Sequence, residues 1–331
     1  MMEAYGLVHG RIERVAPDRA ADVMWMDLLN PSRVEEQAAE KLLGLAVPTR
    51  QEMAEIEDSA RLYQEGGALV VTAIVITDVS EGRPSRAPVT FVLTPTHLVS
   101  VRYSNPLPFR TFENRCQRRP ETHTSSDRLF VSLLESIVER AADVLEIVQA
   151  DLNEISLLLF FPAGGKPGPQ RQVKPHRPAD GADLQAILER LGRKNLMISI
   201  LRESLLSLTR LTPYVRVAAE KWMAKEAVVL LKQVDRDLRS LTAYEGQLSS
   251  EIVYLHEATL GLINLDQNRV IKVFSIAAVL FLPPTLVGTV YGMNFEAMPE
   301  LRWVFGYPMA LGLMVLSAVG PYWWFKHRGW L

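Results

Sequence analysis

Cysteine is nearly absent from this sequence, with Cys116 as the single example in 331 residues. One thiol excludes a framework of intramolecular disulfides and fits a reducing compartment. Neither sign of charge dominates, because 36 basic residues stand against 38 acidic ones and the formal net charge is −2. This balance gives no general attraction to nucleic acid, so we expect no nucleic-acid partner.

Motifs of common catalytic chemistry are also missing. The stretch "HEATL" at 256–260 begins like a zinc-protease helix but has Leu260 where the second histidine must stand. The stretch "GGKPG" lacks the spacing of a P-loop. We therefore expect that the chain is not an enzyme and holds no tightly bound cofactor. Residues 1–15 lack a basic segment followed by an apolar run, so we expect no cleavable signal peptide.

The first part of the sequence mixes strand-like and helix-like segments. Residues 5–15 and 22–29 predict strands, and "PSRVEEQAAEKLLG" predicts a helix that ends near Gly44. The run "ALVVTAIVITDV" at 68–79 predicts a strand rich in β-branched residues. We expect an α/β domain over residues 1–125.

Helical periodicity replaces this pattern over residues 126–217, where apolar residues recur at helical spacing among acidic ones. The segment predicts a helical hairpin whose connection is the Pro- and Gly-rich loop at 162–181. We expect Pro213 to interrupt the second helix and a very long last helix to begin near Ala218.

A seam of residues spaced alternately by three and four follows that last helix, which predicts packing against a partner along its length. The seam consists of Leu238, Leu241, Glu245, Leu248, Ile252, Leu255, Thr259 and Leu262. We expect residues 218–272 to form a stalk that continues straight into an apolar segment.

Two segments without charged residues follow, at 273–291 and 303–325. The first would span about 28 Å as a helix, close to the thickness of membrane hydrocarbon. The alternative is a pair of buried core helices. The sequence favours an α+β membrane protein with two C-terminal transmembrane helices.

Positive residues flank the two segments on their outer sides. Arg269 and Lys272 precede the first, and the basic tail at 326–331 follows the second. Cationic flanks mark the cytoplasmic side, so both termini are expected in the cytoplasm and the loop at 292–302 in the periplasm. We therefore expect a multi-pass protein of the cell inner membrane, embedded in the lipid bilayer.

A stripe along one face of the first span has small or neutral polar residues at both ends and apolar residues between them. The stripe consists of Asn268, Ile271, Ser275, Ala278, Leu282, Thr285 and Thr289. Such a stripe is used either for close helix packing or for lining a pore. Two spans cannot enclose a pore, so the second interpretation requires a symmetric homo-oligomer.

The loop carries the most specific motif. The sequence "YGMNFEAMPELRWVFGYP" at 291–308, preceded by "FLPPT" and followed by "PYWWFKHRGWL", resembles the CorA magnesium transporter family. The resemblance implies a homopentameric funnel with a cytoplasmic α/β domain, long stalk helices and two spans per subunit. It implies that the first span lines the pore and that Gly292, Met293 and Asn294 form the selectivity filter.

The implied activity is magnesium influx driven by the membrane potential, with Co²⁺ and Ni²⁺ as secondary substrates. Magnesium releases water reluctantly, and amide oxygens in a ring of Asn294 would hold it through its water shell. Glu296 and Glu300 would concentrate cations at the mouth, or would only keep the loop solvated.

The family also implies that Mg²⁺ is a regulatory ligand, because cytoplasmic divalent cations bound between subunits close the pore. Asp235 and Asp237 are the candidate ligands, and the alternative is a solvated charged helix face. Two other functions stay open, namely a zinc transporter of the same superfamily and a membrane-anchored scaffold without transport.

Overall fold

The computed structural model describes the chain apart from residues 17–22, 56, 119–123, 162–180, 294–302 and 329–331. The chain divides into two compact units. Unit 1 comprises Met1–His176 and Ala186–His256, and unit 2 comprises Arg177–Gln185 and Glu257–Leu331.

A mixed sheet of seven strands forms the centre of unit 1, in the order β2-β1-β3-β7-β6-β5-β4. Among the described strands, the pairings are antiparallel except that of β3 with β7, which is parallel. The strands are β1 (Met2–Val8), β2 (Arg11–Arg14), β3 (Val23–Leu29), β4 (Leu62–Glu65), β5 (Ala68–Thr77), β6 (Ser85–Leu93) and β7 (Leu98–Arg102).

The prediction of one strand over residues 5–15 is wrong, because β1 and β2 form a hairpin there. His9 and Gly10 have φ of 50° and 77°. Two successive residues with positive φ make the tight turn that reverses a chain between antiparallel strands. The prediction of a strand at 22–29 is confirmed by β3.

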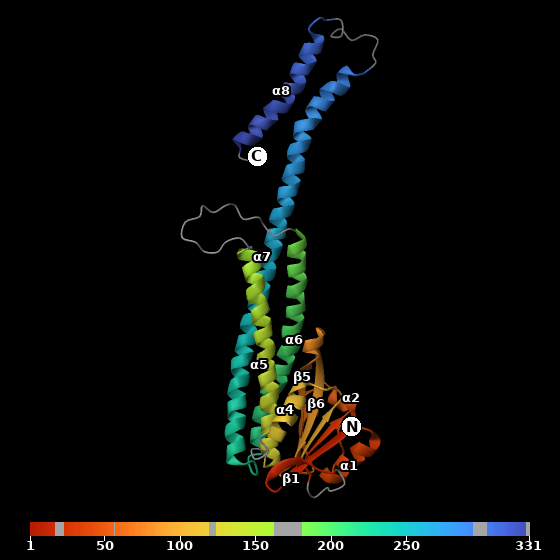
Figure 1. Ribbon diagram of the computed structural model, residues 1–331, viewed down its shortest axis with the longest axis vertical. Helices are drawn as coiled ribbons and strands as arrows, with labels where there is room; N and C mark the ends of the chain where they lie inside the picture. Colours follow the sequence, from red (N-terminus) through yellow and green to blue (C-terminus); the bar gives the residue numbers. More distant parts are fainter. Residues whose placement is uncertain (17–22, 56, 119–123, 162–180, 294–302, 329–331) are drawn as a thin grey trace. The chain divides into compact units, whose positions relative to one another are not determined.

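Helices cover the sheet on both faces. Helices α4 and α5 contact one face, and α1 and α2 contact the other (Figure 1). The short elements are α1 (Arg33–Leu43), α2 (Arg50–Met53), α3 (Asp58–Arg61), the 3-10 turn η2 (Val79–Glu81) and α4 (Leu107–Arg118). The helix predicted to end near Gly44 is confirmed, since Ser32 and Glu35 form a capping box and Gly44 closes α1 at φ 73°.

Long helices account for the rest of the fold: α5 (Ser126–Phe160), α6 (Gly181–Ala218), α7 (Lys225–Tyr291) and α8 (Gly306–His327). Within unit 1, α5, α6 and the first part of α7 run side by side (Figure 1). Lys194 bridges α6 to Asp151 of α5 at 2.5 Å. Tyr244 of α7 donates a hydrogen bond to Gln149 of α5 at 3.1 Å. The predicted loop at 162–181 falls outside the described residues, except for Gly181, where α6 begins.

Two boundaries differ from the prediction. Helix α6 continues through Pro213 to Ala218, and α7 begins at Lys225 rather than near Ala218. A proline removes one helical hydrogen bond. Buried residues on both sides of it hold the helix together, because Leu211 and Val215 are fully buried.

The predicted seam packs inside unit 1 over most of its length. Leu238, Leu248, Ile252 and Leu255 are buried. Its acidic member, Glu245, is buried as well and accepts hydrogen bonds from Nε and Nη2 of Arg202 on α6, at 3.0 and 2.8 Å. The cation makes burial of this carboxylate tolerable.

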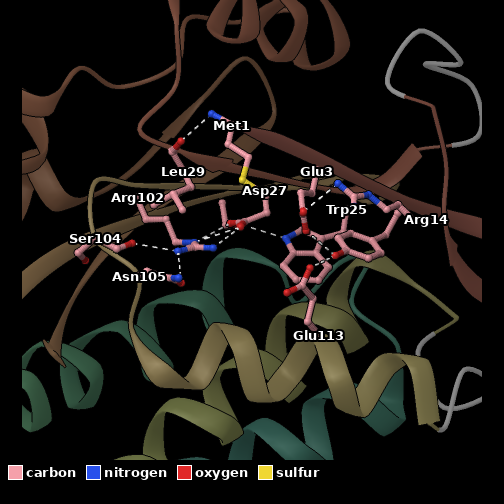
Figure 2. Close-up of polar contacts among 12 residues, drawn as sticks. Met1, Glu3, Arg14, Trp25, Asp27, Leu29, Arg102, Ser104, Asn105 and Glu113 are labelled. Carbon is pink, nitrogen blue, oxygen red and sulfur yellow. Dashed lines mark hydrogen bonds and ion pairs between the residues drawn. The ribbon is translucent and has the colours of Figure 1, made fainter. Parts of the chain in front are cut away.

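A buried ion pair connects β3 and β7, the two strands that pair in parallel (Figure 2). Arg102 on β7 donates from Nε and Nη2 to Asp27 on β3, at 3.0 and 2.7 Å to Oδ2. Ser100 donates to the same carboxylate at 2.6 Å, and Trp25 donates to Ser100 at 3.0 Å. The remaining guanidinium nitrogen, Nη1, donates to the Ser104 carbonyl and the Asn105 side chain. Both charges therefore have a full set of partners.

We expect Asp27→Ala to destabilise the protein by about 3–5 kcal/mol, because it leaves the Arg102 guanidinium buried without its counter-ion. A urea titration of the purified protein in detergent, followed by circular dichroism, measures the shift. Glu189→Gln is the control, since the Arg193–Glu189 pair is 4.0 Å apart and 64% exposed on both sides, so its loss should cost about 0–1 kcal/mol. Equal shifts in the two variants would contradict the prediction.

Candidate functional site

Two helices of the described chain, α7 and α8, contain stretches long and apolar enough to cross a membrane. Helix α7 ends at Tyr291, as predicted for the first span. Helix α8 begins at Gly306 and ends at His327, so the second span is shifted by a few residues from the predicted 303–325. Pro308 explains the start, because a proline lacks the N–H that goes unused in the first helical turn.

The two helices approach closely within unit 2. A Cβ atom at Gly288 of α7 would lie 3.3 Å from Cε of Met314 on α8. A cavity of about 330 Å³ lies beside this contact, with Tyr291, Tyr307 and Leu311 among its lining residues. The half-buried face of α7 consists of Ile276, Ala277, Leu280, Pro283, Pro284, Val287, Gly288 and Tyr291.

The predicted pore stripe lies on the opposite face of α7. All seven positions, Asn268, Ile271, Ser275, Ala278, Leu282, Thr285 and Thr289, are exposed in the single chain. Ile271 and Leu282 are 62% and 66% exposed. Contact with α8 therefore does not explain the small and polar members of this stripe.

The hydroxyl oxygens of the stripe have lone pairs that are free to accept hydrogen bonds from outside the helix. Ser275, Thr285 and Thr289 each donate to the carbonyl four residues earlier, at 2.8, 2.7 and 2.8 Å. A hydroxyl has one hydrogen to donate and two lone pairs. Because the hydrogen is used within the helix, the outward side of each oxygen accepts hydrogen bonds, as the water shell of a cation requires.

The turn after α7 is shaped around a glycine. The Gly292 N–H donates to the Gly288 carbonyl at 3.0 Å, and a Cβ atom at 292 would lie only 3.0 Å from that oxygen. A side chain there would press on the backbone. Met293 is 45% exposed. Asn294, which is predicted to form the filter, and the loop residues Glu296 and Glu300 lie outside the described residues.

The two candidate regulatory acids, Asp235 and Asp237, do not lie together in the structure. Asp235 is buried, accepts from Thr212 at 3.3 Å, and pairs with Arg239 at 2.9 Å. Asp237 is exposed on the other side of α7. Burial of Glu135 on α5 raises the pKa of that carboxyl, and the nearby charge of Asp237 adds to the rise. Across the part of the chain that the structure describes, no group of three acidic, histidine or cysteine side chains is placed to hold a metal ion.

A cluster that sequence reasoning missed lies in unit 1 (Figure 2). The Tyr5 hydroxyl donates to Glu3 at 2.8 Å and contacts the Glu113 carboxyl as well. Burial raises the pKa of Glu113 to about 7, and the neighbouring Glu3 adds to the rise. A hydrogen bond from Glu113 lowers the pKa of Glu3, whose other oxygen pairs with Arg14 at 2.8 Å. Glu3 and Tyr5 are about 110 positions away from Glu113 in the sequence, so no local sequence pattern predicts this cluster.

A family model described as CorA-like Mg²⁺ transporter protein matches residues 20–327. The chain belongs to this family. It is 31% identical over 334 residues to the magnesium transport protein CorA of Pasteurella multocida, and 30% identical over 335 residues to that of Escherichia coli, with 100% of each chain covered.

Solved structures share the CorA-like fold. The complete CorA magnesium transporter of Methanocaldococcus jannaschii matches at a TM-score of 0.78 and 15% identity, covering 100% of this chain and 99% of its own. The full-length CmaX protein matches at 0.67 and 14% identity, covering 98% and 96%. At these identities, the likeness concerns the fold alone.

These matches confirm the resemblance stated from the loop motif. They confirm the coarse fold class, with a soluble α/β part, long helices and two apolar C-terminal helices. The family is one of ion transporters, which confirms that the chain is not an enzyme. The pentamer stays a prediction.

The raised pKa of Glu113 makes the stability of the protein depend on pH. The folded protein holds a proton on Glu113 above the ordinary pKa of 4.5, where the unfolded chain has released it. Stability from this group is therefore full below pH 4.5 and is lost as the pH rises through about 7. We expect the thermal unfolding midpoint to fall over this interval, and to fall less in Glu113→Gln, which stays neutral. Glu189→Gln should keep the wild-type slope; parallel curves for all three proteins would contradict the assignment.

The close contact between Gly288 and Met314 leaves no room for a larger side chain at position 288. We expect Gly288→Leu to destabilise the protein by about 1–3 kcal/mol, because the new side chain overlaps Met314. Adding Met314→Ala to the same chain should restore part of the loss. The control is Gly312→Leu on α8, where a Cβ atom meets nothing within 4 Å. Thermal unfolding in detergent measures all four proteins, and a double variant no more stable than Gly288→Leu would contradict the contact.

Proposed function

We propose that this chain carries Mg²⁺ into the cell across the inner membrane, driven by the membrane potential. The observation that carries the proposal is the exposed stripe on α7, which faces away from α8 and offers outward hydroxyl oxygens in a segment of membrane-crossing length. Membership of a magnesium transporter family supports the choice of ion. Inward movement of a divalent cation gains about 4.6 kcal/mol for each 100 mV, so no coupling ATPase is needed.

Selection would act on the hydrated ion. Magnesium keeps its waters, and waters bound to a cation present their hydrogens outward. The oxygens of Thr285 and Thr289 suit that shell, and a ring of Asn294 amides beyond the Gly292 turn would act as the filter, with Met293 supporting the turn. Neutral ligands bind the ion weakly enough for it to leave.

The pore would be formed by several copies of the chain. One α7 and one α8 cannot enclose a channel, so we propose a homopentamer with the stripe of each α7 turned inward. Ile271 and Leu282 would then form apolar rings that close by dewetting. Asn268, Ser275 and Ala278 would line the remaining positions. Both termini would be cytoplasmic.

Regulation and secondary substrates complete the proposal. Glu296 and Glu300 would attract cations at the periplasmic mouth, and Co²⁺ and Ni²⁺ would follow the same route as Mg²⁺. Cytoplasmic Mg²⁺ bound between subunits would close the pore. Of the two acids considered for that binding, exposed Asp237 fits the role better than Asp235, which already pairs with Arg239.

The test is uptake of Mg²⁺ into proteoliposomes that contain the purified protein, an internal Mg²⁺-sensitive dye and an imposed inside-negative potential. We expect entry that Asn294→Ala abolishes. Thr285→Val with Thr289→Val should slow entry about tenfold, which corresponds to about 1.4 kcal/mol. Ser317→Ala is the matched control, because Ser317 donates to a carbonyl of its own helix α8 and is not part of the stripe.

The alternatives have distinct outcomes in the same assay. Entry of Zn²⁺ without Mg²⁺ would move the chain to zinc transport. Absence of flux for every ion, with an intact oligomer, would leave the anchored scaffold. Equal slowing by Ser317→Ala and the paired threonine variants would contradict the pore face of α7.

A further inference from the structure

A row of polar side chains connects helix α4 to the edge of the sheet (Figure 2). Glu113 of α4 contacts the Tyr5 hydroxyl, and that hydroxyl donates to Oε2 of Glu3 at 2.8 Å. The other oxygen of Glu3 pairs with Arg14 of β2 at 2.8 Å. Four side chains, from α4, β1 and β2, therefore form one continuous row of polar contacts.

This row needs one proton more than two ionised carboxylates provide. A tyrosine hydroxyl has a single hydrogen to donate, and an ionised carboxylate has none. The Tyr5 hydrogen is donated to Glu3, so the contact between Tyr5 and Glu113 needs a hydrogen from Glu113 itself. A hydrogen bond from Glu113, together with the charge of Arg14, lowers the pKa of Glu3, which keeps the negative charge on that carboxyl. The extra proton therefore belongs to Glu113.

Among the described residues around it, Glu113 is the group set to change its charge near neutral pH. Burial raises the pKa of the Tyr5 hydroxyl, and it raises the pKa of the Cys116 thiol to about 12. The charge of Asp27 also acts on Glu113, but both oxygens of Asp27 are held by Arg102. Burial, above all, raises the pKa of Glu113 to about 7.

A deprotonated Glu113 would have no unpaired cation to turn to in the described part of this cluster. The nearby cations are already paired: Arg14 with Glu3, Arg102 with Asp27, and Arg115 with Glu139 on α5. Loss of the proton would therefore leave two negative carboxylates side by side with one hydrogen between them. Like charges at such a distance repel, and the contact between α4 and β1 would break.

The two halves of α4 are held on the sheet by different contacts. In the first half, the buried side chains of Phe109 and Phe112 pack on aromatic rings of the sheet strands. Among the described side chains of residues 113–118, only Cys116 is buried. With one buried side chain in this second half, the polar row carries much of its attachment to the sheet.

We propose that the proton shared by Glu113, Tyr5 and Glu3 is a latch that holds the second half of α4 on the sheet and releases it when the proton is lost. The latch is closed where Glu113 is protonated, and it opens as the pH rises through about 7. Release concerns one end of one helix, which distinguishes it from a general loss of stability. All the residues involved belong to unit 1, so the latch is separate from the path of the transported ion.

Cys116 is a natural reporter of this release, because it is the single cysteine of the chain and is 1% exposed. A buried group reacts when the structure around it opens locally. The test is the rate at which N-ethylmaleimide labels Cys116 in the purified full-length protein in detergent, at one unit below and one unit above the pKa of about 7. Each rate is divided by that of the urea-unfolded chain at the same pH, since thiolate formation also rises with pH.

We expect the corrected labelling rate of the unaltered protein to be about tenfold higher at the higher pH. Glu113→Gln should label slowly at both pH values, because its amide keeps a hydrogen to donate. Tyr5→Phe should label fast at both, because it removes the bridging hydroxyl while keeping the ring that stacks on Trp25 at 4.8 Å. Glu189→Gln on α6 is the control and should behave as the unaltered protein does, since its partner Arg193 is 4.0 Å away.

Amide exchange followed by mass spectrometry separates this release from a loosening of the whole of unit 1. From the lower to the higher pH, exchange corrected for its chemical rate should rise in residues 113–118 and stay unchanged in β5, whose residues are all buried. Equal rises in both segments would overturn a local latch. Equal corrected labelling at both pH values would overturn the proposal, as would a rise in Glu113→Gln as large as in the unaltered protein. Slow labelling of Tyr5→Phe at the lower pH would overturn the role of its hydroxyl.

Discussion

Packing of α7 against α8 decides which surface of α7 is left for any other contact. Gly288 allows the Met314 side chain to approach to 3.3 Å from a would-be Cβ, and the half-buried residues of α7 lie on that side. In a bilayer, lipid tails are as apolar as leucine, so helix association depends on such close contacts. A residue on the opposite face gains nothing from α8. Its polarity therefore reflects another requirement, and this is why the stripe carries the functional argument.

Unit 1 depends on a different interaction. The sheet has two antiparallel parts, β2-β1-β3 and β7-β6-β5-β4, which meet only at the parallel pair. Asp27 on β3 and Arg102 on β7 form an ion pair between these two strands, and their polar atoms are hydrogen-bonded. Removal of charges from water is costly, and a buried pair is tolerated when its hydrogen bonds are complete. On the same side of the sheet lie Glu3, Tyr5 and Glu113, where burial and then the neighbouring Glu3 raise the pKa of Glu113.

Periodic elements could be predicted from the sequence because their signals are local. The capping residues of α1, the β-branched run of β5 and the charge-free segment of α7 each follow from neighbouring residues. The misses involve tertiary context. His9 takes the first position of a left-handed turn, where Asn or Gly is usual, and Gly10 takes the second. Pro213 stays inside α6 because buried leucine and valine outweigh a missing hydrogen bond.

In the candidate site, too, the features with local sequence signals could be predicted and those that depend on tertiary contacts could not. Spacing alone placed the stripe residues on one face, but it left packing and pore lining open, because spacing does not say where α8 lies. The loop motif could be recognised from the sequence alone. The pairing of Asp235 with Arg239 could not be predicted, because it depends on which side of α7 is buried. The Glu113 cluster joins residues more than 100 positions apart, so only the folded sheet brings them together.

In the proposed pore, the neutral oxygens along α7 would also limit where the ion could be selected. Carboxylates on the stripe would bind a divalent cation firmly, and firm binding slows its exit. Ser275, Thr285 and Thr289 donate their hydroxyl hydrogens to carbonyls of the same helix. The stripe face of α7 therefore offers hydrogen-bond acceptors without net charge. Such a face favours a cation's water shell over an anion's, since waters around an anion point their oxygens outward. It does not distinguish one hydrated divalent ion from another. In the proposed pore that distinction would have to come from a narrower element, and the proposed filter follows the Gly292 turn at the end of α7, where a Cβ atom would lie 3.0 Å from the Gly288 carbonyl oxygen.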